Sequence, residues 1–117
     1  MKREVKFRGK RLDNGKWEYG SLVIINGRYF IINDEWRGEV DSETVGQYTG
    51  MVDKTDKEIY EGDIVRGYPQ GIMGKVIYHN DRIEVMDGNP RYWVGLNFFE
   101  PAARIVLGNI HDNPELL

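Results

Sequence analysis

Short runs of β-branched and aromatic residues, separated by turn residues every few positions, extend along the chain. The clearest case is LVIINGRYFII, residues 22–32, in which Asn26 and Gly27 join two such runs. Asn and Gly accept the positive φ angles that a two-residue hairpin turn requires. This segment is therefore predicted to form a β-hairpin.

A second hairpin is predicted directly before the first. In VKFRGKRLDNGKWEYGSL, residues 5–22, Val5 and Phe7 and then Trp17 and Tyr19 are separated by polar residues. Such alternation is typical of strands with one packed face and one wet face. The second strand of this hairpin would also be the first strand of the next one.

Five later segments, residues 63–67, 74–80, 82–86, 91–98 and 103–110, each suit a short strand. No window repeats apolar residues at helical spacing for three turns, so helix is expected only as single turns, at 41–44 or 98–103 and at 113–117. The predicted fold is a mainly β single domain over residues 1–117. Its short antiparallel strands would form a meander or a small SH3-like barrel with little helix.

The composition limits the location of the protein and its chemistry. No run of about 18 apolar residues is present, and no apolar stretch follows the basic start, so neither a membrane span nor a secretory signal is predicted. We therefore expect a cytoplasmic protein with no membrane contact. The absence of cysteine rules out disulfides, thiolate zinc sites and a cysteine nucleophile.

The charges are segregated along the chain. Residues 1–20 carry seven basic and three acidic residues, a net of +4, and residues 34–63 carry ten acidic and three basic residues, a net of −7. These segments are either solvated faces and loops or patches that meet within or between subunits. The sequence leaves both interpretations open.

No motif for catalysis or cofactor binding is found. Neither Ser21 nor Ser42 lies in a nucleophile elbow, and the residues after Asp53 lack the Gly and Glu that a calcium loop requires. The histidines His79 and His111 show no metal-ligand spacing. We expect no catalytic residues, no metal and no cofactor; an enzyme that uses clustered carboxylates and a metal is the least favoured hypothesis.

Nucleic-acid binding is the alternative function. Small barrels can place aromatic residues for base stacking beside basic residues for phosphates. Core packing explains the 14 aromatic residues of the chain equally well. The candidate contacts to a single strand are Lys16, Arg66, Tyr68, Lys75, Arg91 and Tyr92.

Three blocks, FRGKRLDNGKWEYGSL, TVGQYTGMVDKTDKEIYEGDIV and GNIHDNPELL, occur in an order and at a spacing that resemble the YopX family of phage and prophage proteins. The resemblance covers the chain from end to end. It implies a phage or prophage gene product in the bacterial host cytoplasm that assembles into homo-oligomers. It brings no established activity and no catalytic residues.

The favoured function is that of a non-catalytic accessory protein, which acts through self-association and through binding to an unknown host or phage protein. Asp63 beside Gly62 is expected to hydrogen-bond the backbone of its turn. The charged tip of the preceding hairpin needs no structural partner, and it is the candidate interaction surface. Its residues are Asp53, Lys54, Asp56, Lys57 and Glu58.

Overall fold

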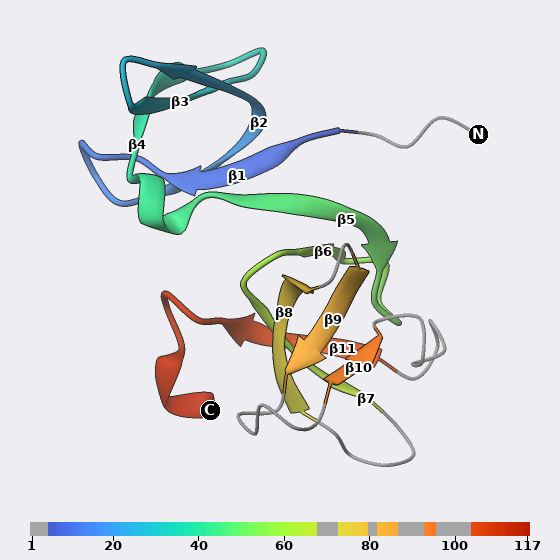
Figure 1. Cartoon of the computed structure of the whole chain (residues 1–117). Helices are drawn as coiled ribbons and strands as arrows, with labels where there is room; N and C mark the ends of the chain where they lie inside the picture. The colour runs from blue at the N-terminus through green and yellow to red at the C-terminus, as the bar shows by residue number, and fades with distance from the viewer. Residues whose placement is uncertain (1–4, 68–72, 80–81, 87–92, 96–103) are drawn as a thin grey trace. The chain divides into compact units, whose positions relative to one another are not determined.

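In the computed structural model the chain forms two compact units, Met1–Gly50 and Met51–Leu117, which we call the N-terminal and C-terminal units. The structure describes residues 5–67, 73–79, 82–86, 93–95 and 104–117. We describe each unit by itself. The strands (Figure 1) are β1 Phe7–Lys10, β2 Trp17–Ile25, β3 Arg28–Ile32, β4 Arg37–Val40, β5 Gly46–Val52, β6 Glu58–Tyr60, β7 Asp63–Gly67, β8 Met73–His79, β9 Arg82–Met86, β10 Trp93–Gly95 and β11 Arg104–Asn109.

The N-terminal unit is an antiparallel sheet in the order β4-β3-β2-β1-β5. Strand β5 continues into the C-terminal unit, where its end lies beside β6. Both predicted hairpins are present: β1 pairs with β2 from Phe7–Gly20 to Lys10–Trp17, and β2 pairs with β3 from Ser21–Ile32 to Ile25–Arg28. Asn26 and Gly27 have φ angles of 51° and 76°, which is the left-handed geometry that their turn was predicted to adopt.

The two halves of β2 pair with different neighbours, residues 17–20 with β1 and residues 21–25 with β3. Gly20 sits at the change of partner, and a Cβ atom at this position would lie 2.2 Å from the Ile32 carbonyl oxygen. Only a glycine permits that approach. The curled sheet buries Ile31 and Val40, and Val40 also bridges to Arg11, but the strands do not close into a barrel. The meander was therefore the correct alternative.

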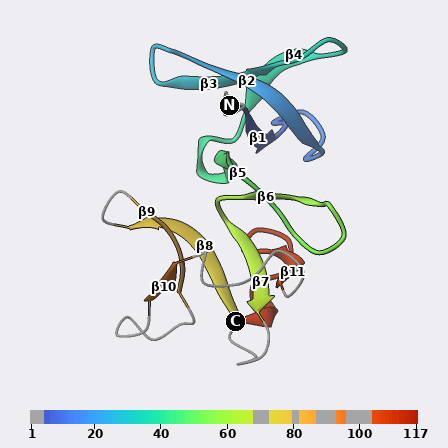
Figure 2. The same cartoon turned by 90° about the vertical axis from the view of Figure 1, so that its right-hand side faces the viewer.

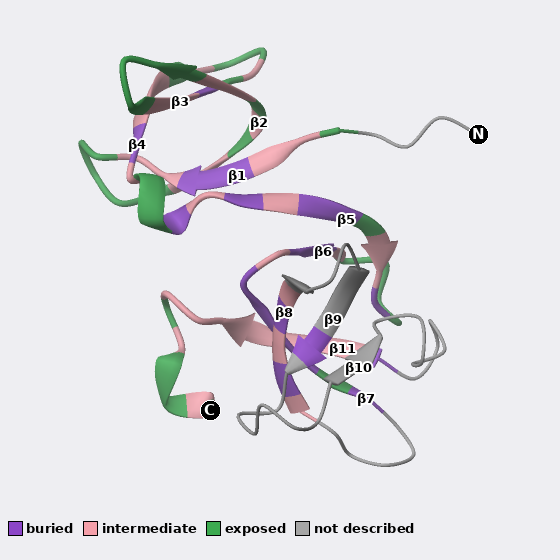
Figure 3. Ribbon diagram, in the orientation of Figure 1, coloured by how far each residue is buried: buried purple, intermediate pink, exposed green. Residues whose placement is uncertain are grey.

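The C-terminal unit has an antiparallel sheet in the order β10-β9-β8-β7-β11 (Figure 2). Its core is formed by Ile59, Val65, Val76 and Val85, all fully buried, with Met51 and Val106 packed against them. Figure 3 shows buried residues on β7 and β8 and exposed ones around the β2–β3 hairpin. The prediction of a mainly β fold is confirmed.

The helical elements among the described residues are two single turns of 3-10 helix. The first, η1 Ser42–Thr44, is capped by the Asp41 side chain, which accepts a hydrogen bond from the Glu43 amide at 3.0 Å. The second, η4 Pro114–Leu116, begins with a proline. Both lie where the sequence predicted them, residues 98–103 lie outside the described residues, and no helix in the described ranges is long and apolar enough to cross a membrane.

Candidate interaction surfaces

The first residue of the predicted interaction surface, Asp53, lies inside the C-terminal unit and is 3% exposed. Its Oδ1 atom accepts hydrogen bonds from the Thr55 amide at 2.7 Å, the Thr55 hydroxyl at 2.6 Å and the Lys57 amide at 3.1 Å. Its Oδ2 atom accepts from the Val106 amide of β11 at 3.0 Å. The placement of Asp53 on the surface is thus corrected, because the carboxylate is needed to join the β5–β6 turn to β11.

Arg104, on β11, completes this arrangement. It is 5% exposed, its Nε atom donates to the Val52 carbonyl at 2.8 Å, and its backbone carbonyl accepts from the Lys54 amide at 2.9 Å. Burial lowers the pKa of the Arg104 guanidinium, and the charge of Asp53 opposes that change. The two residues stabilise the same strand junction.

The pKa of the Asp53 carboxyl is lowered by its surroundings. Burial acts in the opposite direction and raises the pKa, but the hydrogen bonds from the Thr55 hydroxyl and from the Val106, Thr55 and Lys57 amides outweigh it. The ionised form is therefore the one that fits the fold. A side chain that looked available for a partner is used entirely within the chain.

Of the remaining predicted residues of this surface, three lie in the β5–β6 turn and Glu58 begins β6. Lys54, Asp56 and Lys57 are exposed and Glu58 is half-buried. Asp56 has a φ of 65°, so the turn holds it in the left-handed region. Together these four side chains form a surface of mixed charge on the C-terminal unit.

The last aspartate of the block TVGQYTGMVDKTDKEIYEGDIV behaves as predicted. Asp63 is 2% exposed, and its Oδ2 atom accepts a hydrogen bond from the Tyr60 amide at 2.8 Å. It stabilises the turn between β6 and β7. In the C-terminal block, Asn109 has the same kind of role, since its Oδ1 accepts from the His111 and Asp112 amides at 3.0 and 2.9 Å.

The predicted nucleic-acid contacts do not form one described cluster. Arg66 is exposed and Lys75 is half-buried. They share one face of the β7–β8 pair, because Lys75 is opposite Ile64, and Ile64 and Arg66 are two residues apart on β7 and so point to the same face. Lys16 is exposed in the turn between β1 and β2 of the N-terminal unit. The other three candidates, Tyr68, Arg91 and Tyr92, lie outside the described residues.

A row of basic and aromatic side chains that the sequence reasoning missed follows β1. The Lys6 ammonium lies 5.2 Å from the centre of the Tyr48 ring, and the Arg8 guanidinium and the Lys10 ammonium lie 4.7 and 5.4 Å from that of Trp17. The spacing of the bases at every second residue of KFRGK was the signal for a one-sided row. Arg8 and Tyr48 are 5% and 8% exposed, so the middle of the row is covered.

A second cluster fixes the turn between β3 and β4. Asn33 accepts hydrogen bonds from the Glu35 and Trp36 amides at 2.9 and 2.8 Å and donates to the Glu18 carboxylate at 3.1 Å. The other carboxylate oxygen of Glu18 pairs with Arg11 at 2.6 Å, and the Arg11 guanidinium lies 4.4 Å from the centre of the Trp36 ring. These polar residues are explained by the fold of the N-terminal unit.

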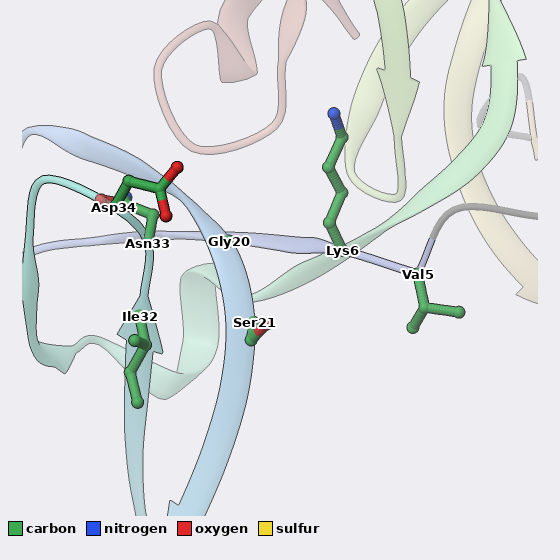
Figure 4. Close-up of a pocket in the computed structure, with 7 residues that line it drawn as sticks. All are labelled: Val5, Lys6, Gly20, Ser21, Ile32, Asn33 and Asp34. Carbon is green, nitrogen blue, oxygen red and sulfur yellow. The ribbon is translucent and has the colours of Figure 1, made fainter.

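A hollow of about 410 Å³ opens in the N-terminal unit where β1 and β2 diverge (Figure 4). We call it the corner hollow. Figure 4 shows Lys6 and Asp34 extending to one side of the strand crossing and Val5 and Ile32 to the other. It is lined by Val5 and Lys6 before β1, by Gly20 and Ser21 of β2, and by Ile32, Asn33 and Asp34 at the end of β3.

A smaller hollow of about 300 Å³ adjoins the first one, since both include Asn33 and Asp34. Its other lining residues are Glu18, Tyr19 and Glu35, so this end is acidic. Within the described ranges no group of three His, Cys, Asp or Glu side chains is placed to hold a metal ion. The two hollows are suited to binding a ligand through side-chain and backbone contacts.

The comparisons with known proteins show the family through one match and the fold through another. The sequence model of the family described as YopX protein matches residues 6–117. The chain is similar to the crystal structure of protein EF1440 from Enterococcus faecalis, with a TM-score of 0.61 and 21% identity over 99% of both chains. No curated protein sequence matches the chain.

Proposed function

The chain belongs to the YopX family, and from this premise we propose that it is a non-catalytic accessory protein of a phage or prophage. It acts in the bacterial cytoplasm, through self-association and through binding to a host or phage protein. The crystal structure from Enterococcus faecalis supports the expected fold and no more than that.

The observation that carries this proposal is the exposure of three isoleucines on the β2–β3 hairpin. Ile24, Ile25 and Ile32 are 53%, 55% and 40% exposed. Full burial of one such side chain stabilises a complex by about 1.5–3 kcal/mol relative to leaving it in water. Ile24 and Ile25 lie next to the turn, one on each face of β2, and Ile32 lies at the other end of the hairpin. Large apolar side chains exposed in this way are available for burial in a protein interface.

The charged tip of the β5–β6 turn supports the same function in the C-terminal unit. Lys54, Asp56 and Lys57 are exposed and carry both signs of charge. Charges at the rim of an interface contribute more to selecting a partner than to affinity. The tip is thus proposed as the selective surface and the hairpin as the apolar one.

The test of self-association uses the double variant Ile24→Ser/Ile25→Ser. Size-exclusion chromatography with light scattering should show an oligomer for the wild type and a shift towards the monomer for the variant. Leu12→Ser is the matched control, because Leu12 is 58% exposed but lies in the β1–β2 turn. A wild type that stays monomeric at high concentration contradicts the proposal.

A second candidate function is weak binding of single-stranded nucleic acid, and the row of bases and aromatic rings along β1 is the observation that favours it. Fluorescence anisotropy with a labelled oligonucleotide across a salt series tests it. Affinity must fall as salt rises if phosphates are bound. No binding at low salt removes this candidate.

A further inference from the structure

The sequence contains two Asn-Gly pairs, Asn14-Gly15 between β1 and β2 and Asn26-Gly27 between β2 and β3. Because glycine has no Cβ atom to shield its amide nitrogen, this nitrogen can reach the side-chain carbonyl carbon of a preceding asparagine. Both pairs are exposed (Figure 3), and both glycines have a positive φ, 73° and 76°. Exposure and glycine conformation therefore do not distinguish the two pairs.

The turn between β1 and β2 holds both reacting groups of its pair by hydrogen bonds. The Asn14 Oδ1 atom accepts from the Lys16 amide at 2.9 Å. The Gly15 amide donates to the Arg11 carbonyl at 3.0 Å. A reaction between the two groups requires both bonds to open first.

The β2–β3 turn does not hold its pair in this way. Within the described ranges, neither the Asn26 side chain nor the Gly27 amide makes a hydrogen bond. No atom lies within 4 Å of a Cβ atom placed on Gly27, so the neighbouring space is open to the Asn26 side chain. We propose that Asn26 is a site of spontaneous modification, at which the carboxamide is converted to a carboxylate through a cyclic imide with Gly27.

The reaction needs only water and releases ammonia. The Gly27 amide nitrogen attacks the Cγ atom of Asn26, the bond from Cγ to Nδ2 breaks, and the Gly27 amide proton leaves with Nδ2 as ammonia. Water then opens the imide at one of its two carbonyls. Opening at Cγ gives aspartate in a normal main chain, and opening at the main-chain carbonyl gives isoaspartate, whose main chain runs through the former side chain.

Both products place a carboxylate next to the exposed Ile24 and Ile25. It is ionised at neutral pH and resists transfer out of water. Conversion should therefore weaken self-association through these isoleucines. This effect rests on the proposed function, whereas the modification itself does not.

The test ages the full chain at mildly alkaline pH and follows both pairs by mass spectrometry after trypsin digestion. Cleavage after Lys and Arg places the pairs in separate fragments, residues 12–16 and 17–28. Asn26 should convert about tenfold faster than Asn14, because two hydrogen bonds protect the Asn14 pair. Isoaspartate should be among the products, since direct hydrolysis of the carboxamide cannot form it.

The chain denatured in guanidinium chloride is the control for the two turns. There the two pairs should react at similar rates, because no turn protects either of them. Equal rates in the folded chain, or an Asn26 that reacts only in the denatured chain, would overturn the proposal. A difference that persists in denaturant would also overturn it, since neighbouring residues and not the turns would then cause it.

The variant Asn26→Asp supplies the charge of the product in uniform form, and Asn14→Asp is the matched control in the other turn. Light scattering should show a shift towards the monomer for the first variant and wild-type association for the second. Asn26→Gly, which accepts a positive φ and cannot react, should associate like the wild type before and after ageing.

The outcomes separate the modification from the proposed function. Equal association of the two Asp variants would refute the effect of the new charge. A wild type that is monomeric throughout would refute the proposed function and with it that effect. The conversion of Asn26, which is measured by mass, is decided independently of association.

Discussion

The β5–β6 turn of the C-terminal unit and the β2–β3 hairpin of the N-terminal unit depart in opposite ways from the usual burial of apolar and exposure of charged residues. The turn buries a charged residue, Asp53, and the hairpin exposes apolar residues such as Ile25 and Ile32. The chain itself supplies every donor that explains Asp53. Nothing comparable within the described chain covers the isoleucines, so the surface with unused binding capacity is the hairpin.

Removal of the Asp53 carboxylate should have the largest effect on stability. Asp53→Ala leaves three amides without their acceptor and the Arg104 guanidinium without its nearby charge. We expect a loss of about 3–5 kcal/mol in the free energy of unfolding, as for one partner removed from a buried ionic group. Urea unfolding followed by tryptophan fluorescence measures it.

Lys54→Ala is the control for that variant, because this neighbouring side chain is exposed and its backbone amide still donates to Arg104. Its free energy of unfolding should remain within about 0.5 kcal/mol of that of the wild type. Equal losses for the two variants would show that the turn, and not the carboxylate, carries the stability.

The same carboxylate predicts an acid-sensitive component of stability. The pKa of Asp53 is lower in the folded chain than in the unfolded one. Folding therefore gains stability above the unfolded pKa of about 3.9, and this gain is lost as the pH falls from there through the folded pKa. The free energy of unfolding, measured from pH 6 to pH 2, should fall by this component in the wild type. In Asp53→Asn this fall should be absent.

Gly20→Ala should be the next largest change, and it acts on the corner. The added methyl group would lie 2.2 Å from the Ile32 carbonyl oxygen, so β2 and β3 must move apart. Overpacking of this kind costs about 1–3 kcal/mol. Ser21→Ala, at the adjacent exposed position, is the control, and a Gly20→Ala protein as stable as this control would refute the close approach.

Much of the fold could be predicted from local patterns. Asn26-Gly27 determines a hairpin by its own backbone preferences, and both single helical turns begin at residues suited to that role, Asp41 and Pro114. Such signals are contained in a few neighbouring residues. For that reason they can be read without knowledge of the rest of the chain.

The role of Asp53 could not be predicted in this way. One of its partners, Val106, is 53 residues away, and no local pattern announces a hydrogen bond across that separation. The covered basic row has a similar origin, because the contact of Lys6 with Tyr48 depends on the pairing of β1 with β5. Sequence patterns located the charged turn but not which of its residues were already in use.

Gly27→Ala should weaken the hairpin on which the exposed isoleucines lie. A φ of 76° is unfavourable for a residue with a Cβ atom, at a cost of about 1–2 kcal/mol. No atom lies within 4 Å of the added methyl group, so backbone strain is the whole effect. Thermal unfolding should show the loss, and a variant as stable as the wild type would contradict the turn geometry.

The smallest effect on stability is expected from Ile24→Ser/Ile25→Ser, which changes exposed side chains at the hairpin tip. Substitutions of this kind usually stay within about 0.5 kcal/mol each. Measured on dilute protein, the unfolding free energy should therefore barely change, while the dependence of the melting temperature on protein concentration should disappear. The isoleucines would then be needed for association and not for folding. A loss of several kcal/mol in dilute protein would instead place them in the fold, as Asp53 is, and the contrast between the two regions would fail.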